Sequence, residues 1–135
     1  MEALEQEIEL SHNQKVEKLK EILTKLNLPV LPLNTVKCGF YVPDVVTRIN
    51  ENFVVMDFIN SKERIPYDIG GLCLIYNKDI VDYCLGIIDD KLWKENEKEL
   101  RRVVMNLPPK LKIIRFGKAK EWFAEQAEKS NLWKP

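Results

Sequence analysis

The sequence predicts one domain of the α+β or α/β class, in which a mixed sheet of about four strands is covered by helices and preceded by an N-terminal helical arm. Three observations predict this fold class. Apolar residues recur at helical spacing near both ends, short runs rich in β-branched and aromatic residues lie between them, and strand and helix patterns alternate late in the chain. At 135 residues, of which 45% are hydrophobic, the chain can bury a core without disulfides or a metal.

The N-terminal part is predicted to be helical. We expect residues 1–135 to form a single domain with an acidic helical arm (1–10), a main helix (12–27) and an α/β body (35–135). Ser11 followed three residues later by Gln14 has the form of a capping box, which predicts that the main helix begins there. The arm carries four glutamates and no base: Glu2, Glu5, Glu7 and Glu9.

An extended connector and a first strand are predicted next. Two prolines block a helix in 27–34, and 36–42 is expected to be a strand. Residues 44–52 fit two patterns. Apolar residues four apart from Val45 onward favour a short helix, which is the prediction we adopt, whereas a β-hairpin with its turn at 50–52 is the alternative.

The second half is predicted to alternate between strands and helices. The predicted elements are strands at 53–59, 71–76 and 110–116, a helix carrying Ile80 to Leu85, a helix over about 92–106 and a last helix over about 118–129. A polar loop is expected at 60–70, with Gly70-Gly71 as a turn or bulge before a central strand. Asp89-Asp90 is expected to cap the helix that follows, and the late strand–helix–strand order predicts a right-handed parallel crossover.

Charge is segregated along a chain that is neutral overall, with 21 bases and 21 acids. Residues 101–120 contain a run of bases without an acid among them: Arg101, Arg102, Lys110, Lys112, Arg115, Lys118 and Lys120. Such a run is a candidate anion-binding surface for phosphate or nucleic acid. The alternative, which we favour, is a solvated rim whose cations pair with nearby glutamates.

Cysteine and histidine usage argues against a metal or a cofactor. Cys38, Cys73 and Cys84 are widely spaced in apolar surroundings and contain no CxxC pair, so we interpret them as buried small residues in a reducing compartment. His12 is the single histidine, and we predict no metal site, no cofactor and no catalytic residue. The absence of a long apolar run and the acidic N-terminus predict a cytoplasmic protein without a membrane partner.

One pair of acids resembles the loose pattern of a metal-dependent nuclease, in which two acids hold Mg²⁺ and a lysine assists. Pro43-Asp44 and Asp57 have this arrangement, but Phe58 and Ile59 follow Asp57 where an acid-x-Lys step is required, so we interpret the match as coincidental. Asp57 is expected to share a strand face with Phe53 and Val55. If buried, it needs a partner such as Arg48, Arg64 or a backbone donor, and a structural role is then favoured over a catalytic one.

The leading functional hypothesis is a non-enzymatic intracellular binding or adaptor module that acts through protein–protein contacts. The acidic arm at 1–10 and the basic face at 101–120 are its two contact regions, and their opposite charges allow two copies to pack arm to face as a homodimer. The alternative is a nucleic-acid- or phosphate-binding protein that uses the basic face. A second alternative is a small enzyme that uses Asp57 or a cysteine, which requires a cleft with convergent polar groups.

Overall fold

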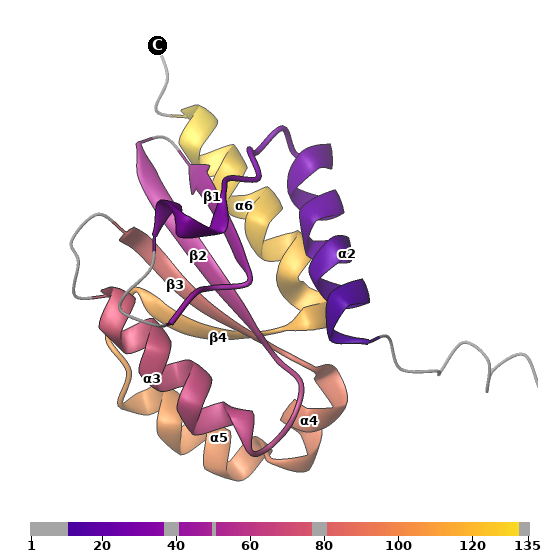
Figure 1. Cartoon of the computed structure of the whole chain (residues 1–135), viewed down its shortest axis with the longest axis vertical. Coiled ribbons are helices and arrows are strands. Elements are labelled where there is room, and N and C mark those ends of the chain that lie inside the picture. Colours follow the sequence, from indigo (N-terminus) through magenta and orange to yellow (C-terminus); the bar gives the residue numbers. More distant parts are fainter. Residues whose placement is uncertain (1–10, 37–40, 50, 77–80, 133–135) are drawn as a thin grey trace, which may run out of the picture.

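The fold is a four-stranded mixed sheet between two layers of helices, as the sequence predicted (Figure 1). The computed structural model describes residues 11–36, 41–49, 51–76 and 81–132. The strands are β1 (Val45–Ile49), β2 (Asn52–Ile59), β3 (Val81–Ile88) and β4 (Leu111–Arg115). They are ordered β1-β2-β3-β4, with β1 antiparallel to β2 and the other pairs parallel. The predicted parallel crossover therefore occurs twice, from β2 to β3 and from β3 to β4.

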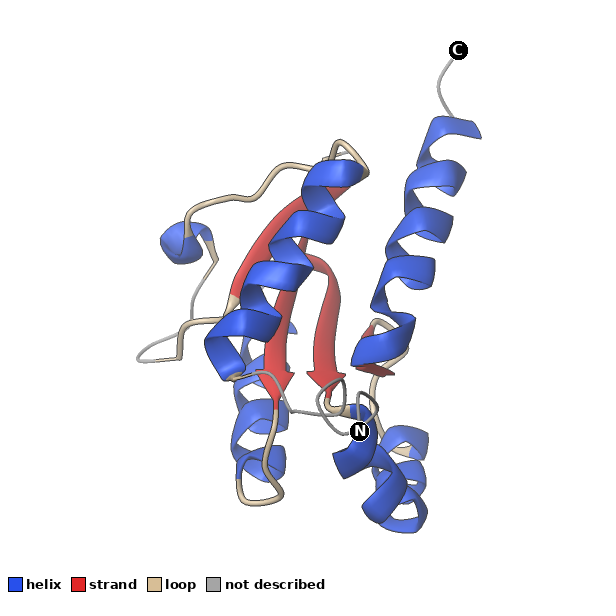
Figure 2. Ribbon diagram, turned by 90° about the vertical axis from the view of Figure 1, so that its right-hand side faces the viewer, coloured by secondary structure: helices blue, strands red, loops and turns tan. Residues whose placement is uncertain are grey.

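Helices cover both faces of the sheet. The long helices α2 (His12–Lys25) and α6 (Ala119–Leu132) lie on one face, and Figure 2, viewed from their side, shows them in front of the strands. The other face carries α3 (Arg64–Tyr76), α4 (Asp90–Glu95) and α5 (Glu97–Met105) (Figure 1). Short 3₁₀ turns occur at η1 (Leu33–Thr35) and η2 (Phe116–Lys118). None of the helices in the described ranges has the length and apolar character that crossing a bilayer requires.

Alternation along β2 separates two halves of the core. Val54, Met56 and Phe58 pack with α2 and α6, whereas Val55 and Ile59 pack in clusters on the α3 side. Side chains alternate between the two faces of a strand, so Asp57 lies on the same face as Val55. This placement was predicted, and it directs a carboxyl group into the layer between the sheet and α3.

Local signals define both ends of α2. Both hydrogen bonds of the predicted capping box are present between Ser11 and Gln14. At the other end, Asn27 adopts φ 61°, Asn27 N–H donates to the Thr24 carbonyl at 3.0 Å, and Leu28 N–H donates to the Leu23 carbonyl at 2.9 Å. These bonds form a Schellman motif, in which asparagine tolerates the left-handed conformation that ends the helix.

The structure corrects the predictions for 36–52. Residues 44–52 do not form the short helix that we adopted, because Val45–Ile49 pairs with 52–56 as the hairpin considered as the alternative. Cross-strand pairing of β-branched residues outweighs their accidental helical spacing. For the strand predicted at 36–42, residues 37–40 lie outside the described residues, and Tyr41 forms only an isolated bridge.

A second correction concerns residues 60–85. The predicted loop at 60–70 and central strand at 71–76 are wrong, because most of this segment forms α3, whose buried residues follow helical spacing: Asp68, Ile69, Leu72 and Ile75. Gly70-Gly71 is therefore in the interior of a helix. The helix predicted to carry Ile80 to Leu85 is instead the central strand β3, although Asn77 and Ile80 lie outside the described residues.

The C-terminal third follows its sequence pattern closely. β4 and α6 confirm the predicted strand and helix. The predicted helix over 92–106 is present as two helices, because it is interrupted at Asn96 between α4 and α5. The expected cap is confirmed, since Leu92 N–H donates to Asp89 Oδ2 at 3.2 Å.

Candidate functional site

A polar pocket of about 320 Å³ opens where β2 leaves the sheet and the chain turns into α3. Its walls come from four segments: the start of α2, the residues before β1, the end of β2 and the first turn of α3. Ligands of open α/β sheets commonly bind at the carboxyl ends of strands, where loops diverge. The pocket occupies this position at β2.

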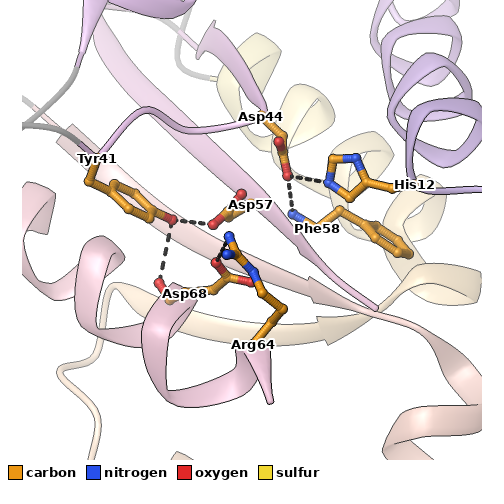
Figure 3. A network of polar contacts seen from close by, with 7 residues as sticks. All are labelled: His12, Tyr41, Asp44, Asp57, Phe58, Arg64 and Asp68. Atoms are coloured by element: carbon orange, nitrogen blue, oxygen red, sulfur yellow. Dashed lines mark hydrogen bonds and ion pairs between the residues drawn. The ribbon is translucent and has the colours of Figure 1, made fainter. Parts of the chain in front are cut away.

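Two aspartates meet at this pocket. Asp57 comes from β2 and is only 4% exposed. Asp44 directly precedes β1 and is tied to β2 at two points, because its N–H donates to the Met56 carbonyl at 2.9 Å and its Oδ2 accepts from Phe58 N–H at 2.7 Å. These backbone bonds hold the Asp44 carboxylate beside Asp57 (Figure 3).

Tyr41 closes the pocket from the side. Its hydroxyl donates to Asp57 Oδ2 and lies 3.4 Å from the Asp68 carbonyl (Figure 3). A Cβ built on Gly71 would lie 2.0 Å from Tyr41 Cε1, so the tyrosine ring fits only because residue 71 has no side chain. Burial, followed by the charge of Asp57 and the hydrogen bond to it, raises the pKa of Tyr41, which keeps its hydroxyl a donor.

Burial and the neighbouring acid favour the protonated form of Asp57. Burial, followed by the hydrogen bond to Asp44 and the Asp44 charge, raises the pKa of Asp57 to about 10, although the Tyr41 hydroxyl acts in the opposite direction. A charged carboxylate is disfavoured at a buried position near another acid, so Asp57 is protonated near neutral pH. Burial also raises the pKa of Asp68, and its hydrogen bonds and the Arg64 charge only partly offset the effect.

Cationic and aromatic side chains lie around the mouth of the pocket. His12 Nε2 lies 3.0 Å from Asp44 Oδ2, and Arg64 Nη2 donates to Asp68 Oδ1 at 2.9 Å. The Arg64 guanidinium also lies 4.4 Å from the centroid of the Tyr67 ring. The pocket thus combines an acidic interior with the Arg64 guanidinium at its mouth, and this guanidinium can bind an anion.

From the sequence, Asp44 and Asp57 were noted together but their match was interpreted as coincidental, and only Asp57 was retained as an alternative enzyme residue. The partner expected for Asp57 was Arg48, Arg64 or a backbone donor, and the structure corrects this, because the hydrogen-bond donor is the Tyr41 hydroxyl. Arg48 is exposed, and Arg64 pairs with Asp68 instead. The Pro43-Asp44 and Asp57 pattern was the available signal.

Carboxylate oxygens are the candidate metal ligands here. Among the described residues, no three histidine, cysteine or acidic side chains are grouped so as to hold a metal ion. A two-carboxylate site is therefore the most that this pocket offers. Mg²⁺ is commonly bound by one or two carboxylates, with waters and substrate phosphates completing its coordination.

The seven bases of the 101–120 run lie away from this pocket. All are exposed and none lines it. They extend from α5 through β4 to η2 and α6, and α5 and α6 cover opposite faces of the sheet (Figure 1). Three lie within ion-pair distance of acids in the part of the chain that the structure describes, in the pairs Arg101–Glu97, Lys110–Asp82 and Lys118–Glu121. An anion-binding surface formed by Arg101, Arg102, Lys110, Lys112, Arg115, Lys118 and Lys120 stays a prediction.

The described cysteines lack the surroundings of a nucleophile. Burial raises the pKa of Cys84 to about 12 and also raises the pKa of Cys73. A catalytic cysteine needs the opposite shift, because the thiolate is the reactive form. Cys38 lies outside the described residues.

The chain has no significant match to a protein-family model, to a curated protein or to a solved structure. The function is therefore argued from the geometry of the pocket.

Proposed function

We propose that the chain is a small enzyme that binds a divalent cation at Asp44 and Asp57 and hydrolyses a phosphodiester. The observation that carries this proposal is the pair of adjacent carboxyl groups at a cavity of about 320 Å³, at the carboxyl end of β2. This function corresponds to the Asp57 enzyme hypothesis rather than to the adaptor hypothesis, because convergent polar groups surround Asp57.

Electrostatics favours a cation between the two acids. Burying the charged Asp57 carboxylate near Asp44 is costly, and near neutral pH a proton on Asp57 reduces the cost. A divalent cation can replace that proton and neutralise both groups. Hard cations such as Mg²⁺ and Mn²⁺ prefer carboxylate oxygens, so these two side chains supply a suitable anchor.

The rest of the pocket fits a phosphate-bearing substrate. The acids alone would repel an anion, so a bound cation is required to attract it and to polarise a phosphoryl oxygen. Arg64 adds a guanidinium, which suits phosphate oxygens. His12, hydrogen-bonded to Asp44, occupies the position of a general base and can assume the role of the lysine that the nuclease-like pattern lacks after Asp57.

Calorimetric titration with Mn²⁺ tests the proposal. We expect one cation to bind per wild-type chain and binding to be lost in Asp57→Asn and Asp44→Asn. Asp82→Asn is a matched control, because Asp82 pairs with Lys110 and does not line the pocket. Hydrolysis of a chromogenic phosphodiester should require the cation and follow the same variants. Equal cation binding by wild type and both pocket variants would refute the site.

The protein-contact hypothesis remains a second candidate because of a groove elsewhere. This groove of about 310 Å³ lies between α2 and the start of α6. It is lined by apolar Ile22, Leu26 and Phe116, by Lys18, Lys25 and Lys120, and by Glu21. Apolar contacts surrounded by lysines suit an acidic amphipathic segment, and residues 1–10 carry four glutamates with Leu4 and Ile8.

Light scattering tests this contact between copies of the chain. If the acidic arm of one copy binds the groove of another, wild type forms a homodimer and deletion of residues 1–10 yields a monomer. Lys120→Glu should weaken the dimer without removing the arm, and Lys62→Glu, on the far side near α3, is the control. A mass that does not change on deletion would exclude the arm as the dimer contact.

A further inference from the structure

An exposed aromatic ring lies at the mouth of the acidic pocket. Tyr67, in the first turn of α3, is 57% exposed and lines the pocket. Tyrosine is amphipathic, and a ring this accessible leaves apolar surface in water beside the site. The ring is therefore available to contact a ligand that enters the pocket.

Neighbouring groups hold this ring in place. The Arg64 guanidinium lies 4.4 Å from the ring centroid, and the Tyr41 ring centroid is 6.3 Å away. Arg64 is itself anchored by Asp68, whose side chain is 1% exposed, while the arginine side chain remains 52% exposed. The guanidinium thus lies over one face of the Tyr67 ring, and the two groups form a stacked platform that Asp68 anchors through Arg64. Such pre-arrangement lowers the entropy lost when a flat ligand stacks on an outer face of this platform.

We infer that the pocket takes an unpaired nucleotide, whose base stacks on the Tyr67–Arg64 platform while its phosphate faces Arg64 and the Asp44–Asp57 pair. This inference rests on the proposed phosphodiester chemistry and specifies its substrate as single-stranded nucleic acid. Stacking on aromatic and arginine side chains accepts every base, because every base has a π face.

The same geometry disfavours a duplex. Bases in a duplex are stacked on each other, so their faces are not available to a ring on a helix. The seven cationic side chains of the 101–120 run also lie outside the pocket. Arg64 is the one lysine or arginine among the described residues that line the pocket, so it can contact one phosphate backbone but not two. Selectivity for unpaired nucleotides then comes from Tyr67 rather than from charge.

Fluorescence anisotropy with labelled oligonucleotides tests the inference. In Ca²⁺, a labelled single strand should bind more tightly than a duplex of the same length. Tyr67→Ala should weaken single-strand binding about 5- to 100-fold, the range expected for the loss of one stacked base. Tyr67→Phe keeps the ring and should restore the affinity. Leu74→Ala is the matched control, since Leu74 is 53% exposed on the same helix but does not line the pocket.

The outcomes separate this inference from the proposed function. Equal binding of single strand and duplex, no binding of either, or unchanged affinity in Tyr67→Ala would overturn the inference even if Mn²⁺ binds at Asp57. Tyr67-dependent binding of the single strand that persists in chelator, with no cation bound by wild type, would support the stacking of a base on Tyr67. It would overturn the cation-dependent enzyme and the position of the phosphate at the Asp44–Asp57 pair.

Discussion

At the scale of single residues, the tightest packing at the pocket is between Gly71 and Tyr41. Because a Cβ at residue 71 would overlap the ring, we expect Gly71→Ala to displace Tyr41 from Asp57 and to lower the free energy of unfolding by about 2–3 kcal/mol. Gly70 is the matched control. No atom lies within 4 Å of its Cβ position, so Gly70→Ala should stabilise α3 by about 0.5–1 kcal/mol. Urea denaturation of both variants checks this, and shifts of the same sign would contradict it.

Thr47 offers a second prediction from one side chain. It lies fully buried in β1, and its hydroxyl has no hydrogen-bond partner among the described residues. Valine has nearly the same shape without the polar group, so Thr47→Val should raise the free energy of unfolding by about 1 kcal/mol. Thr47→Ser retains the hydroxyl but loses a methyl group and should cost about 1 kcal/mol. Destabilisation by valine in thermal or urea unfolding would mean that the hydroxyl has a partner.

At the scale of elements, an ion pair joins α2 to the cap of α4. Lys15 Nζ donates to Asp89 Oδ1, and both side chains are largely buried, at 8% and 17% exposure. Burial raises the pKa of Asp89, but the hydrogen bond and charge of Lys15, together with backbone donors, outweigh burial and lower it. The pair therefore contributes stability above the ordinary aspartate pKa, and this contribution is lost as the pH falls through the lowered value.

Variants of this pair test the link between the helices. Asp89→Asn retains an N-cap side chain but leaves the Lys15 ammonium buried without its partner, which should cost about 3 kcal/mol near pH 7. The difference from wild type should shrink at an acidic pH below the lowered pKa of Asp89, where that carboxyl group is also neutral. The double variant Lys15→Met with Asp89→Asn should recover much of the loss. Urea unfolding at both pH values measures this, and additive single losses in the double variant would contradict the pairing.

The elements also show which parts of the fold local sequence can predict. α2, β2, β4 and α6 were predicted because each has a cap or an apolar pattern that its environment preserves. β3 was mistaken for a helix because it lies between two parallel neighbours with both faces covered, and such a strand is apolar without alternation. α3 was mistaken for a loop and a strand because a broad buried face and Gly70-Gly71 obscure its helical period.

Local sequence also predicts only part of the candidate site. Asp57 was recognisable, because an acid in an apolar strand is unusual by itself. Asp44 was noted only through the nuclease-like match, which was interpreted as coincidental. Tyr41, His12 and Arg64 come from separate segments and reach the pocket only through the crossover of β2 into α3 and the packing of α2. No local sequence pattern predicts that these three side chains come together at the pocket.

At the scale of the whole molecule, the side chains of the candidate site lie at one end of the sheet. β2, β3 and β4 are parallel, so their carboxyl ends lie at the same end of the sheet. The pocket, the Asp89 cap and η2 lie at this end. The hydrophobic core lies on both faces of the sheet, between this end of the strands and the opposite end. The polar cluster is thus buried without interrupting the core, and its ionisation is coupled to the stability of the whole domain.

This coupling predicts the pH dependence of stability. The pKa of Asp57 is about 10 in the folded chain and about 4 in an unfolded one. Between these values the folded state holds a proton that the unfolded state has released, so the contribution of Asp57 to stability falls as the pH rises, by at most about 1.4 kcal/mol per pH unit for one proton. In chelator, urea unfolding from about pH 5 to about pH 9 should show this decline.

Asp57→Asn identifies the group responsible. The amide resembles the protonated acid, so the variant should lose stability less steeply and exceed wild type at about pH 8, with Asp68 accounting for some of the remaining slope. A divalent cation should act in place of the proton and restore wild-type stability at high pH, but should not change Asp57→Asn. If the free energy of unfolding falls equally steeply with pH in wild type and in Asp57→Asn, the proton on Asp57 does not determine the stability at alkaline pH. If the slope is smaller in Asp57→Asn and Mn²⁺ restores stability in wild type alone, proton and cation occupy the same carboxyl pair.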